Sequence, residues 1–437
     1  MAARLDLGSE KGTQSLIHCS VLDFGGTSEK YRHVDNISFE NHVMVDRFLD
    51  YWRRCGCQRV GVLLGRYSVH GDVPLGIKAT VMAIYEPPQV SSRHSVELQV
   101  DAMLAEFEQL NQLCAKLQIV RVGWIFTDLS PMQDSHGAVQ CTRTAESYLV
   151  SAEECITAAW LQNLHPNATR FSQDGIFGSK FVTVVVSGDA ANQVHLTGYQ
   201  VSNQCCALVA DNILVPLNGC PELAYVRDNP LTKEQYIPDV KFKEKDQYGN
   251  EVTKDGRPLP VEYLLVDVPC GMPIEQSYTF HASTQRPVPI EHRDAIGEFQ
   301  LLNEPLQLAA DIHLLAFLLT NNVKPFSLSV TFASQTLQDS LAGLLDAVRD
   351  QSAAAAADWF NSNEDWLTMT HLMSADNATP LAANGLASPA PVGSASAAGP
   401  GVGGPSGQAA ASWVCAHCTF QNVHGRDECE MCGLPRQ

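Results

Sequence analysis

Four cysteines near the C-terminal end restrict the fold of their segment more strictly than any other feature of the chain. Two C-x2-C pairs are separated by ten residues, and each pair places two thiolates on one tight turn. Two such turns supply the four sulfur ligands of a structural zinc ion. So short a segment has no core of its own, so metal binding must supply most of its folding free energy. The sequence therefore predicts a one-zinc module over residues 412–437, with these ligands: Cys415, Cys418, Cys429 and Cys432.

The same segment resembles a zinc finger of the Ran-binding-protein-2 type, because it matches W-x-C-x2-C-x3-N-x6-C-x2-C from Trp413 to Cys432. One subset of these fingers binds ubiquitin through a Thr-Phe pair after the second cysteine and a hydrophobic residue before the fourth. The resemblance implies ubiquitin contacts at Thr419, Phe420 and Met431. Exposed side chains of Phe420 and Met431 would form an apolar patch that suits binding to a partner. Packing of Phe420 onto the zinc turn is the structural alternative.

Another subset of these fingers binds single-stranded RNA, and the charge of this chain disfavours that alternative. The chain carries 48 acidic and 29 basic residues, a net charge of −19, whereas phosphate binding depends on Lys and Arg. The same balance disfavours an anionic membrane surface. The longest apolar run, Ile312–Leu319, is far shorter than the ~20 residues of a membrane span. We therefore expect no nucleic-acid partner and no membrane insertion.

The remaining chain alternates between helical and extended patterns, which predicts an α/β (α+β) fold for its first domain, residues 30–225. A helix is expected from Val43 to a C-cap at Gly56, and another from the capping box Ser151-Ala-Glu-Glu154. A third amphipathic pattern covers residues 98–117. Short apolar runs predict strands at 60–64, 77–85, 120–126, 181–186 and 195–201.

Three further segments complete the predicted organisation. Residues 226–375 form a mixed C-terminal domain with strands at 240–242 and 261–268 and with helices at 306–319 and 337–360. Residues 376–411 are rich in Ala, Gly, Pro and Ser, which predicts a flexible linker before the finger. Residues 1–29 show little periodicity and are predicted to be a flexible leader.

Residues from Lys30 to Ala375 resemble the nuclear protein localisation protein 4 family. The resemblance rests on long stretches that follow in order: 30–36, 65–67, 83–89, 122–128, 151–156, 177–181 and 198–204. The family acts as an adaptor, with a ubiquitin-fusion-degradation partner subunit, for the AAA ATPase valosin-containing protein. The resemblance implies that the chain binds ubiquitin and polyubiquitin chains. It also implies extraction of clients for proteasomal degradation, including at the endoplasmic reticulum. It also implies a cytoplasmic and nuclear protein that associates peripherally with that membrane.

The first domain also resembles an MPN domain, the fold of JAMM metalloproteases that cut ubiquitin isopeptide bonds. Active members hold zinc with two imidazoles and a carboxylate, leaving one position for water. Here Phe126 and Asp128 stand at the histidine positions and Gln58 at the glutamate position. Phe126 cannot bind zinc and Gln58 cannot act as a general base. The resemblance thus implies a domain without catalytic residues, in which Asp128 and Glu154 are structural or surface groups.

The start of the chain departs from the family pattern. Members begin with a ubiquitin-like domain and a zinc-binding segment that dock onto the ATPase, whereas the resemblance here starts at Lys30 and residues 1–29 match neither. This predicts a shortened form that keeps ubiquitin and partner-subunit binding and leaves direct contact with the ATPase open. The alternatives to a non-enzymatic adaptor are an MPN-type metal-dependent isopeptidase and an RNA-binding zinc-finger protein.

Overall fold

The chain forms two compact units, Met1–Trp359 and Phe360–Gln437, which are described separately. The structure is a computed structural model. It describes residues 2–4, 21–24, 32–132, 137–233, 235–280, 306, 309–320, 335–364, 366–367, 413–414 and 421–422.

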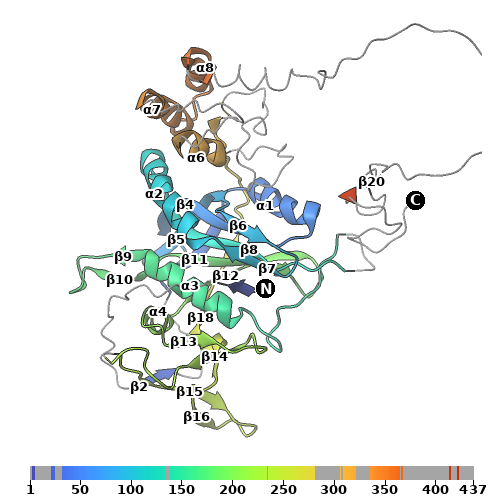
Figure 1. The fold of residues 1–437 in the computed structure, drawn as a ribbon, viewed down its shortest axis with the longest axis vertical. Coiled ribbons are helices and arrows are strands. Elements are labelled where there is room, and N and C mark those ends of the chain that lie inside the picture. The colour runs from blue at the N-terminus through green and yellow to red at the C-terminus, as the bar shows by residue number, and fades with distance from the viewer. Residues whose placement is uncertain are drawn as a thin grey trace, which may run out of the picture. The chain divides into compact units, whose positions relative to one another are not determined.

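An eight-stranded mixed sheet forms the centre of the first unit (Figure 1). Its strands are listed here from one edge to the other: β18 (Leu265–Val268), β12 (Val194–Val201), β11 (Val182–Gly188), β8 (Val120–Thr127), β4 (Val60–His70), β5 (Gly76–Tyr85), β3 (Asn36–Phe39) and β19 (Cys270–Gly271). Three pairs are parallel, β11 with β8, β5 with β3 and β3 with β19, and the others are antiparallel.

Glycines allow backbones of the sheet to approach closely. A Cβ at Gly123 of β8 would lie 2.4 Å from the Val182 carbonyl oxygen of β11. The next residue, Trp124, donates its indole N–H to Thr183 Oγ1 at 2.8 Å across the same strand pair. At the ends of the sheet, Gly198 of β12 lies against Ile37 of β3, so the outer strands curl toward each other.

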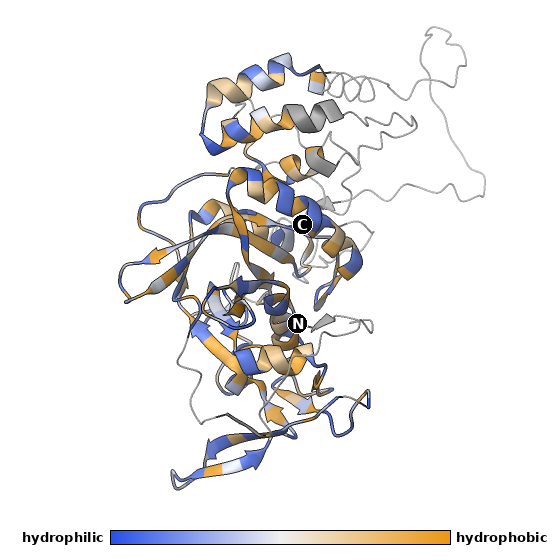
Figure 2. Cartoon of the chain, turned by 90° about the vertical axis from the view of Figure 1, so that its left-hand side faces the viewer, coloured by the Kyte–Doolittle hydropathy of each residue, from blue (hydrophilic) through white to orange (hydrophobic). Residues whose placement is uncertain are grey.

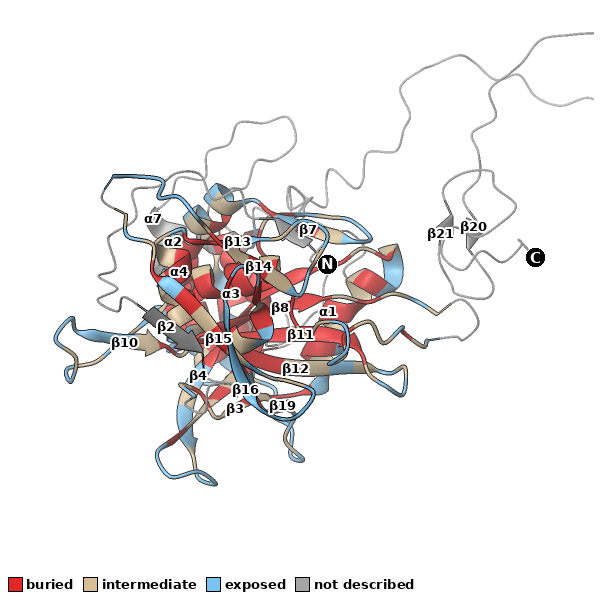
Figure 3. Ribbon diagram, turned by 90° about the horizontal axis from the view of Figure 1, so that it is seen from below, coloured by how far each residue is buried: buried red, intermediate tan, exposed pale blue. Residues whose placement is uncertain are grey.

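Helices cover the sheet and bury its apolar residues. Five side chains of α1 (His42–Cys55) join the main hydrophobic core with alternate residues of β11, such as Val182 and Val184. The helix ends at Gly56, whose φ of 69° suits glycine and whose N–H bonds to the Trp52 carbonyl. Other helices of this unit are α2 (Val100–Leu117), α3 (Ala152–Leu164) and α4 (Asn203–Ala210). Figure 3 shows β8 and β11 almost wholly buried and the outer hairpins exposed.

Smaller sheets and hairpins lie around the central sheet. β1 (Ala2–Arg4) pairs with β7 (Ser95–Leu98), which also pairs with β6 (Gln89–Ser91). β2 (Val21–Phe24) pairs with β15 (Asp239–Lys245), so two short strands fall within residues 1–29. The hairpin of β15 and β16 is largely hydrophilic (Figure 2). The remaining short strands are β9 (Pro166–Ala168), β10 (Ile176–Ser179), β13 (Leu214–Pro216), β14 (Leu223–Val226), β16 (Glu251–Asp255) and β17 (Leu259–Pro260).

A helical part lies beside α2 (Figure 1). It contains α6 (Ile312–Thr320) and α7 (Gln335–Arg349), which contact α2 and each other. The predicted continuous helix over 337–360 is interrupted, because Gln351 adopts a φ of 53° and α8 (Ala353–Ser362) starts anew behind it. None of the helices in the described ranges combines the length and the apolar character that crossing a bilayer requires.

The second unit contains two described features. Phe360 and Trp366 pack with ring centroids 5.0 Å apart. β20 (Trp413–Val414) and β21 (Gln421–Asn422) form an antiparallel pair in which Trp413 lies opposite Asn422. The strands therefore bracket, in sequence, the first C-x2-C pair of the predicted finger. Residues 376–411, the predicted linker, lie outside the described residues.

Several predicted elements differ in extent from the observed ones. The strand predicted at 60–64 is longer, because β4 continues to His70 as an exposed hairpin that an apolar-run criterion misses. The strand predicted at 261–268 starts with a 3-10 turn (Val261–Leu264), and only its second half is β18. β18 and β19 extend the sheet of the first predicted domain, although they lie in the second. α4 was not predicted, because its eight residues are too few to show a helical period.

Candidate functional site

Four residues that the sequence assigns to a lost metal site gather where β8 ends. Phe126 is the last but one residue of this buried strand, and Asp128 directly follows the strand. Gln58 precedes β4, which pairs with β8, and Glu154 lies in the first turn of α3. The two strands and the helix thus bring these residues together as the sequence predicts, although Glu154 is nearly 100 residues from Gln58 in the chain.

Gln58 is a structural amide whose polar atoms are all engaged. Its Oε1 accepts hydrogen bonds from the Thr127 hydroxyl at 2.8 Å and from the Leu129 N–H at 3.1 Å. Its Nε2 donates to the carbonyls of Leu129 at 2.8 Å and Arg93 at 2.9 Å. An ionised glutamate in this place could not donate a hydrogen bond to the carbonyl oxygens of Leu129 and Arg93. Gln58 therefore fixes the chain on both sides of Asp128 and has no lone pair for proton abstraction.

Arg143 joins the two carboxylates of the site. Its Nε donates to Asp128 Oδ2 at 2.8 Å. Its two terminal nitrogens bind Glu154 in a fork, with Nη1 to Oε2 at 2.8 Å and Nη2 to Oε1 at 2.7 Å. This bidentate pairing is the strongest form of an arginine–carboxylate contact. The sequence-based reasoning did not single out Arg143, which lies in the long segment between the two acids.

Arg143 and Glu154 are buried, which decides between the structural and the surface role expected for Glu154. The Glu154 side chain is 0% exposed and that of Arg143 4% exposed, so neither is a surface group. Burial lowers the pKa of Arg143, but Glu154 and Asp128 outweigh this effect and raise its pKa above the ordinary value. Glu154 also accepts the Ser151 N–H at 3.0 Å in the capping box, so it caps α3 and binds Arg143 at once. Asp128 and Glu154 are thus structural groups, as predicted.

This arrangement lacks the parts of a hydrolytic metal centre. Phe126 offers no metal ligand, and the amide oxygen of Gln58 already accepts two hydrogen bonds. Both carboxylates contact a fixed cation. Within the ranges that the structure describes, no group of three or more His, Cys, Asp or Glu side chains could hold a metal ion. The predicted finger lies elsewhere in the chain, and its residues Cys415, Cys418, Thr419, Phe420, Cys429, Met431 and Cys432 are outside the described residues.

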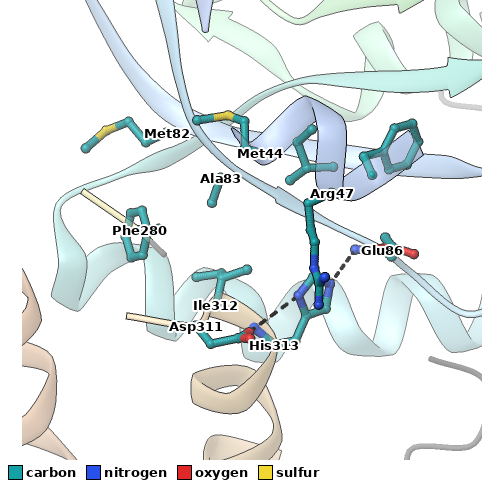
Figure 4. A pocket seen from close by; sticks show the side chains of 11 residues that line it. Met44, Arg47, Met82, Ala83, Glu86, Phe280, Asp311, Ile312 and His313 are labelled. Atoms are coloured by element: carbon teal, nitrogen blue, oxygen red, sulfur yellow. Dashed lines mark hydrogen bonds and ion pairs between the residues drawn. The ribbon is translucent and has the colours of Figure 1, made fainter. Parts of the chain in front are cut away.

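A pocket lies between α1, β5 and α6, on another part of the first unit (Figure 4). Its cavity volume is only about 40 Å³, far below the roughly 300–1,000 Å³ of sites for small ligands. One end is apolar, with Met82 and Phe280, and the other end carries Arg47 and His313 (Figure 4). The complete lining is Met44, Arg47, Phe48, Met82, Ala83, Ile84, Glu86, Phe280, Asp311, Ile312 and His313.

His313 fastens α6 to the sheet at this pocket. Its Nε2 accepts a hydrogen bond from the Glu86 backbone N–H at 3.0 Å. Its ring stacks on Tyr85 with centroids 5.1 Å apart. The Nε2 lone pair is therefore already used, which disfavours a role for His313 as a general base.

The fold and this site define a mixed α/β protein in which a buried arginine joins two carboxylates at the end of a central strand. A family model described as "NPL4 family" matches residues 59–374. A second model, described as a candidate zinc-binding region of the NPL4 family, matches residues 19–56. The chain belongs to the NPL4 family, which confirms the predicted resemblance.

Curated relatives of the chain carry the same family name. The chain is 46% identical to the nuclear protein localization protein 4 homologs of Mus musculus and Homo sapiens over 420 residues, 93% of this chain. It spans 64% of their length, less than two thirds. Nuclear protein localization protein 4 homolog 1 of Caenorhabditis elegans is also 46% identical, over 431 residues, and this chain covers 77% of it.

The predicted start of the resemblance at Lys30 is wrong, because the zinc-region model matches from residue 19. The described histidines and cysteine of that stretch do not form a zinc site. His33 bonds to Asn203 Oδ1 at 3.1 Å, and His42 to Gln276 Oε1 at 2.7 Å. Cys55 is at the opposite end of α1 from His42, about 20 Å away at 1.5 Å per residue. The described donors of residues 19–56 therefore do not fit a shared metal ion.

Proposed function

We propose that this chain is a non-catalytic adaptor that binds ubiquitin. The observation that carries the proposal is the Arg143 bridge between Asp128 and Glu154, next to a Gln58 amide with no free lone pair. A cleft filled in this way supplies neither a metal-bound water nor a general base, so it supports an MPN-like domain that does no hydrolysis.

The proposed ubiquitin contact is the C-terminal finger. Four thiolates at C-x2-C spacing suit zinc, and the pairing of Trp413 with Asn422 supports a hairpin around the first pair. Zinc would be held by Cys415, Cys418, Cys429 and Cys432, and it would fold the module rather than act on a substrate. Thr419, Phe420 and Met431 would then contact an apolar patch of ubiquitin.

The finger would act together with the body. The proposed organisation is an inert MPN-like domain at 30–225, the family C-terminal domain at 226–375 and a flexible linker at 376–411 that lets the finger engage a chain already held by the body. With a ubiquitin-fusion-degradation partner subunit, the protein would deliver polyubiquitinated clients to the valosin-containing protein ATPase for extraction and proteasomal degradation. This work would take place in the cytoplasm and nucleus and, peripherally, at the endoplasmic reticulum.

Calorimetry with ubiquitin chains tests the proposed contact. Phe420→Ala is expected to weaken binding by ten-fold or more, because hot-spot aromatics contribute roughly 1–2 kcal/mol or more. Its zinc content should equal that of the wild type, because Phe420 is not a ligand. Phe171→Ala is a matched control, since Phe171 is a phenylalanine 86% exposed on the β9–β10 hairpin of the body. An affinity unchanged by Phe420→Ala would remove the finger from the proposal.

A second assay separates the adaptor from its alternatives. Incubation of the chain with ubiquitin chains and added zinc should leave every isopeptide bond intact. Cleavage that disappears with a chelator would instead identify a metal isopeptidase. A salt-dependent shift of single-stranded RNA by the chain would favour the RNA-binding alternative.

A further inference from the structure

The hairpin formed by β4 and β5 projects past the neighbouring strand β8 and is exposed at its outer end (Figure 3). β4 pairs with β8 only as far as Gly65, which follows the partner of Val120 in a shifted register, whereas it pairs with β5 as far as His70. Within the described residues, no backbone hydrogen bond from outside the hairpin reaches Tyr67 to His70. Such an open edge presents unpaired N–H and C=O groups, to which an extended polypeptide can add as a further strand.

The two faces of this edge differ in chemistry. Tyr67 and Val69 lie on one face, because side chains alternate along a strand, and Tyr67 packs with Ile77 against the main hydrophobic core. Val69 continues this apolar row but is 82% exposed. Arg66 and Lys78 lie on the other face. A strand added here would therefore have apolar neighbours on one face and cations on the other.

The charge around the edge is positive, although that of the whole chain is negative. The stretch from Arg66 to Lys78 holds these two cations against one acid, Asp72, whereas the chain has 48 acidic and 29 basic residues. Lys180, which precedes β11, places its Nζ 5.3 Å from the ring centre of Tyr67. Arg66 bonds only to backbone carbonyls, and among the described residues no ion pair joins Arg66, Lys78 or Lys180 to a carboxylate. The edge therefore suits an acidic partner.

An extended polypeptide accounts for all of these features. Charged residues at a strand edge can serve only to prevent aggregation. That role does not explain the apolar residues, since Val69 is 82% exposed and Leu75, in the turn of the hairpin, is 100% exposed. A nucleic acid would engage the cations, but it has no backbone that continues a β-sheet.

We propose that the open edge of β4, residues 66–70, is a docking site for an extended polypeptide segment in which acidic and apolar residues alternate. The segment adds as a strand beside β4. Its apolar side chains continue the row of Tyr67 and Val69, and its carboxylates face Arg66 and Lys78. The site lies near the start of β8, at the opposite end of this strand from the Arg143 bridge. It is independent of ubiquitin binding by the finger.

Fluorescence anisotropy with the full chain tests this proposal. The probe is a labelled eight-residue peptide of alternating glutamate and valine, at low salt, and saturable binding is expected. Val69→Glu should weaken binding about ten-fold, because the variant loses an apolar contact and adds a like charge. The side chain is exposed, so the fold should be kept. Val90→Glu is the matched control, since Val90 is a valine 54% exposed on β6, and its affinity should equal that of the wild type.

Two further peptides separate the backbone from the charges. The same peptide with methylated amides at alternate residues cannot pair as a strand and should not bind. A peptide with lysine in place of glutamate should bind Lys78→Glu better than the wild type. Hydrogen–deuterium exchange should show that the acidic peptide protects residues 66–70.

Several results would overturn the proposal. They are no saturable binding of the acidic peptide, equal binding of the methylated one, and an affinity unchanged in Val69→Glu. Single-stranded RNA that binds without the peptide and is lost in Lys78→Glu would assign the edge to a nucleic acid instead. Dimers of the chain that disappear in Val69→Glu, again without peptide binding, would assign it to a second copy.

Discussion

Mild acid is expected to destabilise the first unit through one buried histidine, His165, which follows α3. Its ring stacks on Phe181 with centroids 4.1 Å apart, and its Nδ1 donates to the Leu161 carbonyl at 2.7 Å. Its Nε2 is buried without a hydrogen-bond partner among the described atoms. Burial first, and then the nearby Arg121 guanidinium, lower the pKa of His165 from 6.5 to about 4.

The sign and size of the effect follow from these two pKa values. The unfolded chain takes up the proton near pH 6.5, whereas folded His165 takes it up only near pH 4. The neutral ring therefore contributes stability that is complete above pH 6.5 and is lost as the pH falls from 6.5 through about 4. Each pKa difference of one is worth about 1.4 kcal/mol, so the total loss is roughly 3 kcal/mol.

Urea unfolding at neutral pH and at about pH 4.5, followed by tryptophan fluorescence, measures this loss. Carboxylates also titrate in this range, so the informative quantity is the difference between variants. His165→Gln should be less stable than the wild type at neutral pH and should lose about 2 kcal/mol less on acidification. His195→Gln, which replaces an exposed histidine of β12, should behave as the wild type. An equal loss in wild type and His165→Gln would refute the assignment.

Gly65→Ala should lower the free energy of unfolding by about 1–3 kcal/mol in a urea titration, because the added Cβ would lie 1.8 Å from the Thr80 carbonyl oxygen. Gly71→Ala, on the same hairpin, is the control. Its Cβ would meet nothing within 4 Å, so this variant should be as stable as the wild type. Metal analysis of the purified chain should find one zinc, which is lost in Cys429→Ser. Two zinc ions in the wild type would show a second site outside the finger.

Local signals in the sequence were sufficient for several elements. α1 ends at Gly56 as predicted, since a left-handed cap depends on the residue itself and on the preceding turn. The capping box at Ser151 likewise fixed the start of α3. These features involve residues a few positions apart, which is the range over which a sequence pattern reports directly on structure.

Features that depend on distant partners could not be predicted in this way. The strand β18 was expected, but its place beside β12 is a pairing of residues 64 to 70 positions apart, from Val201 with Leu265 to Gly198 with Val268. No turn fixes that register. Arg143 was missed for the same reason. A signal was nevertheless present, since two acids that lie together in a protein interior need a compensating cation.

The Arg143 bridge explains how two acids can lie together at the end of β8. Removing both imidazoles from a metal site leaves its acids uncompensated, and a buried acid without a partner unfolds a protein more readily than it inactivates it. Arg143 compensates Asp128 and Glu154 with a covalently attached charge that needs no supply of metal. The Arg143 bridge therefore ties the end of β8 to the start of α3 through charged groups of the chain itself.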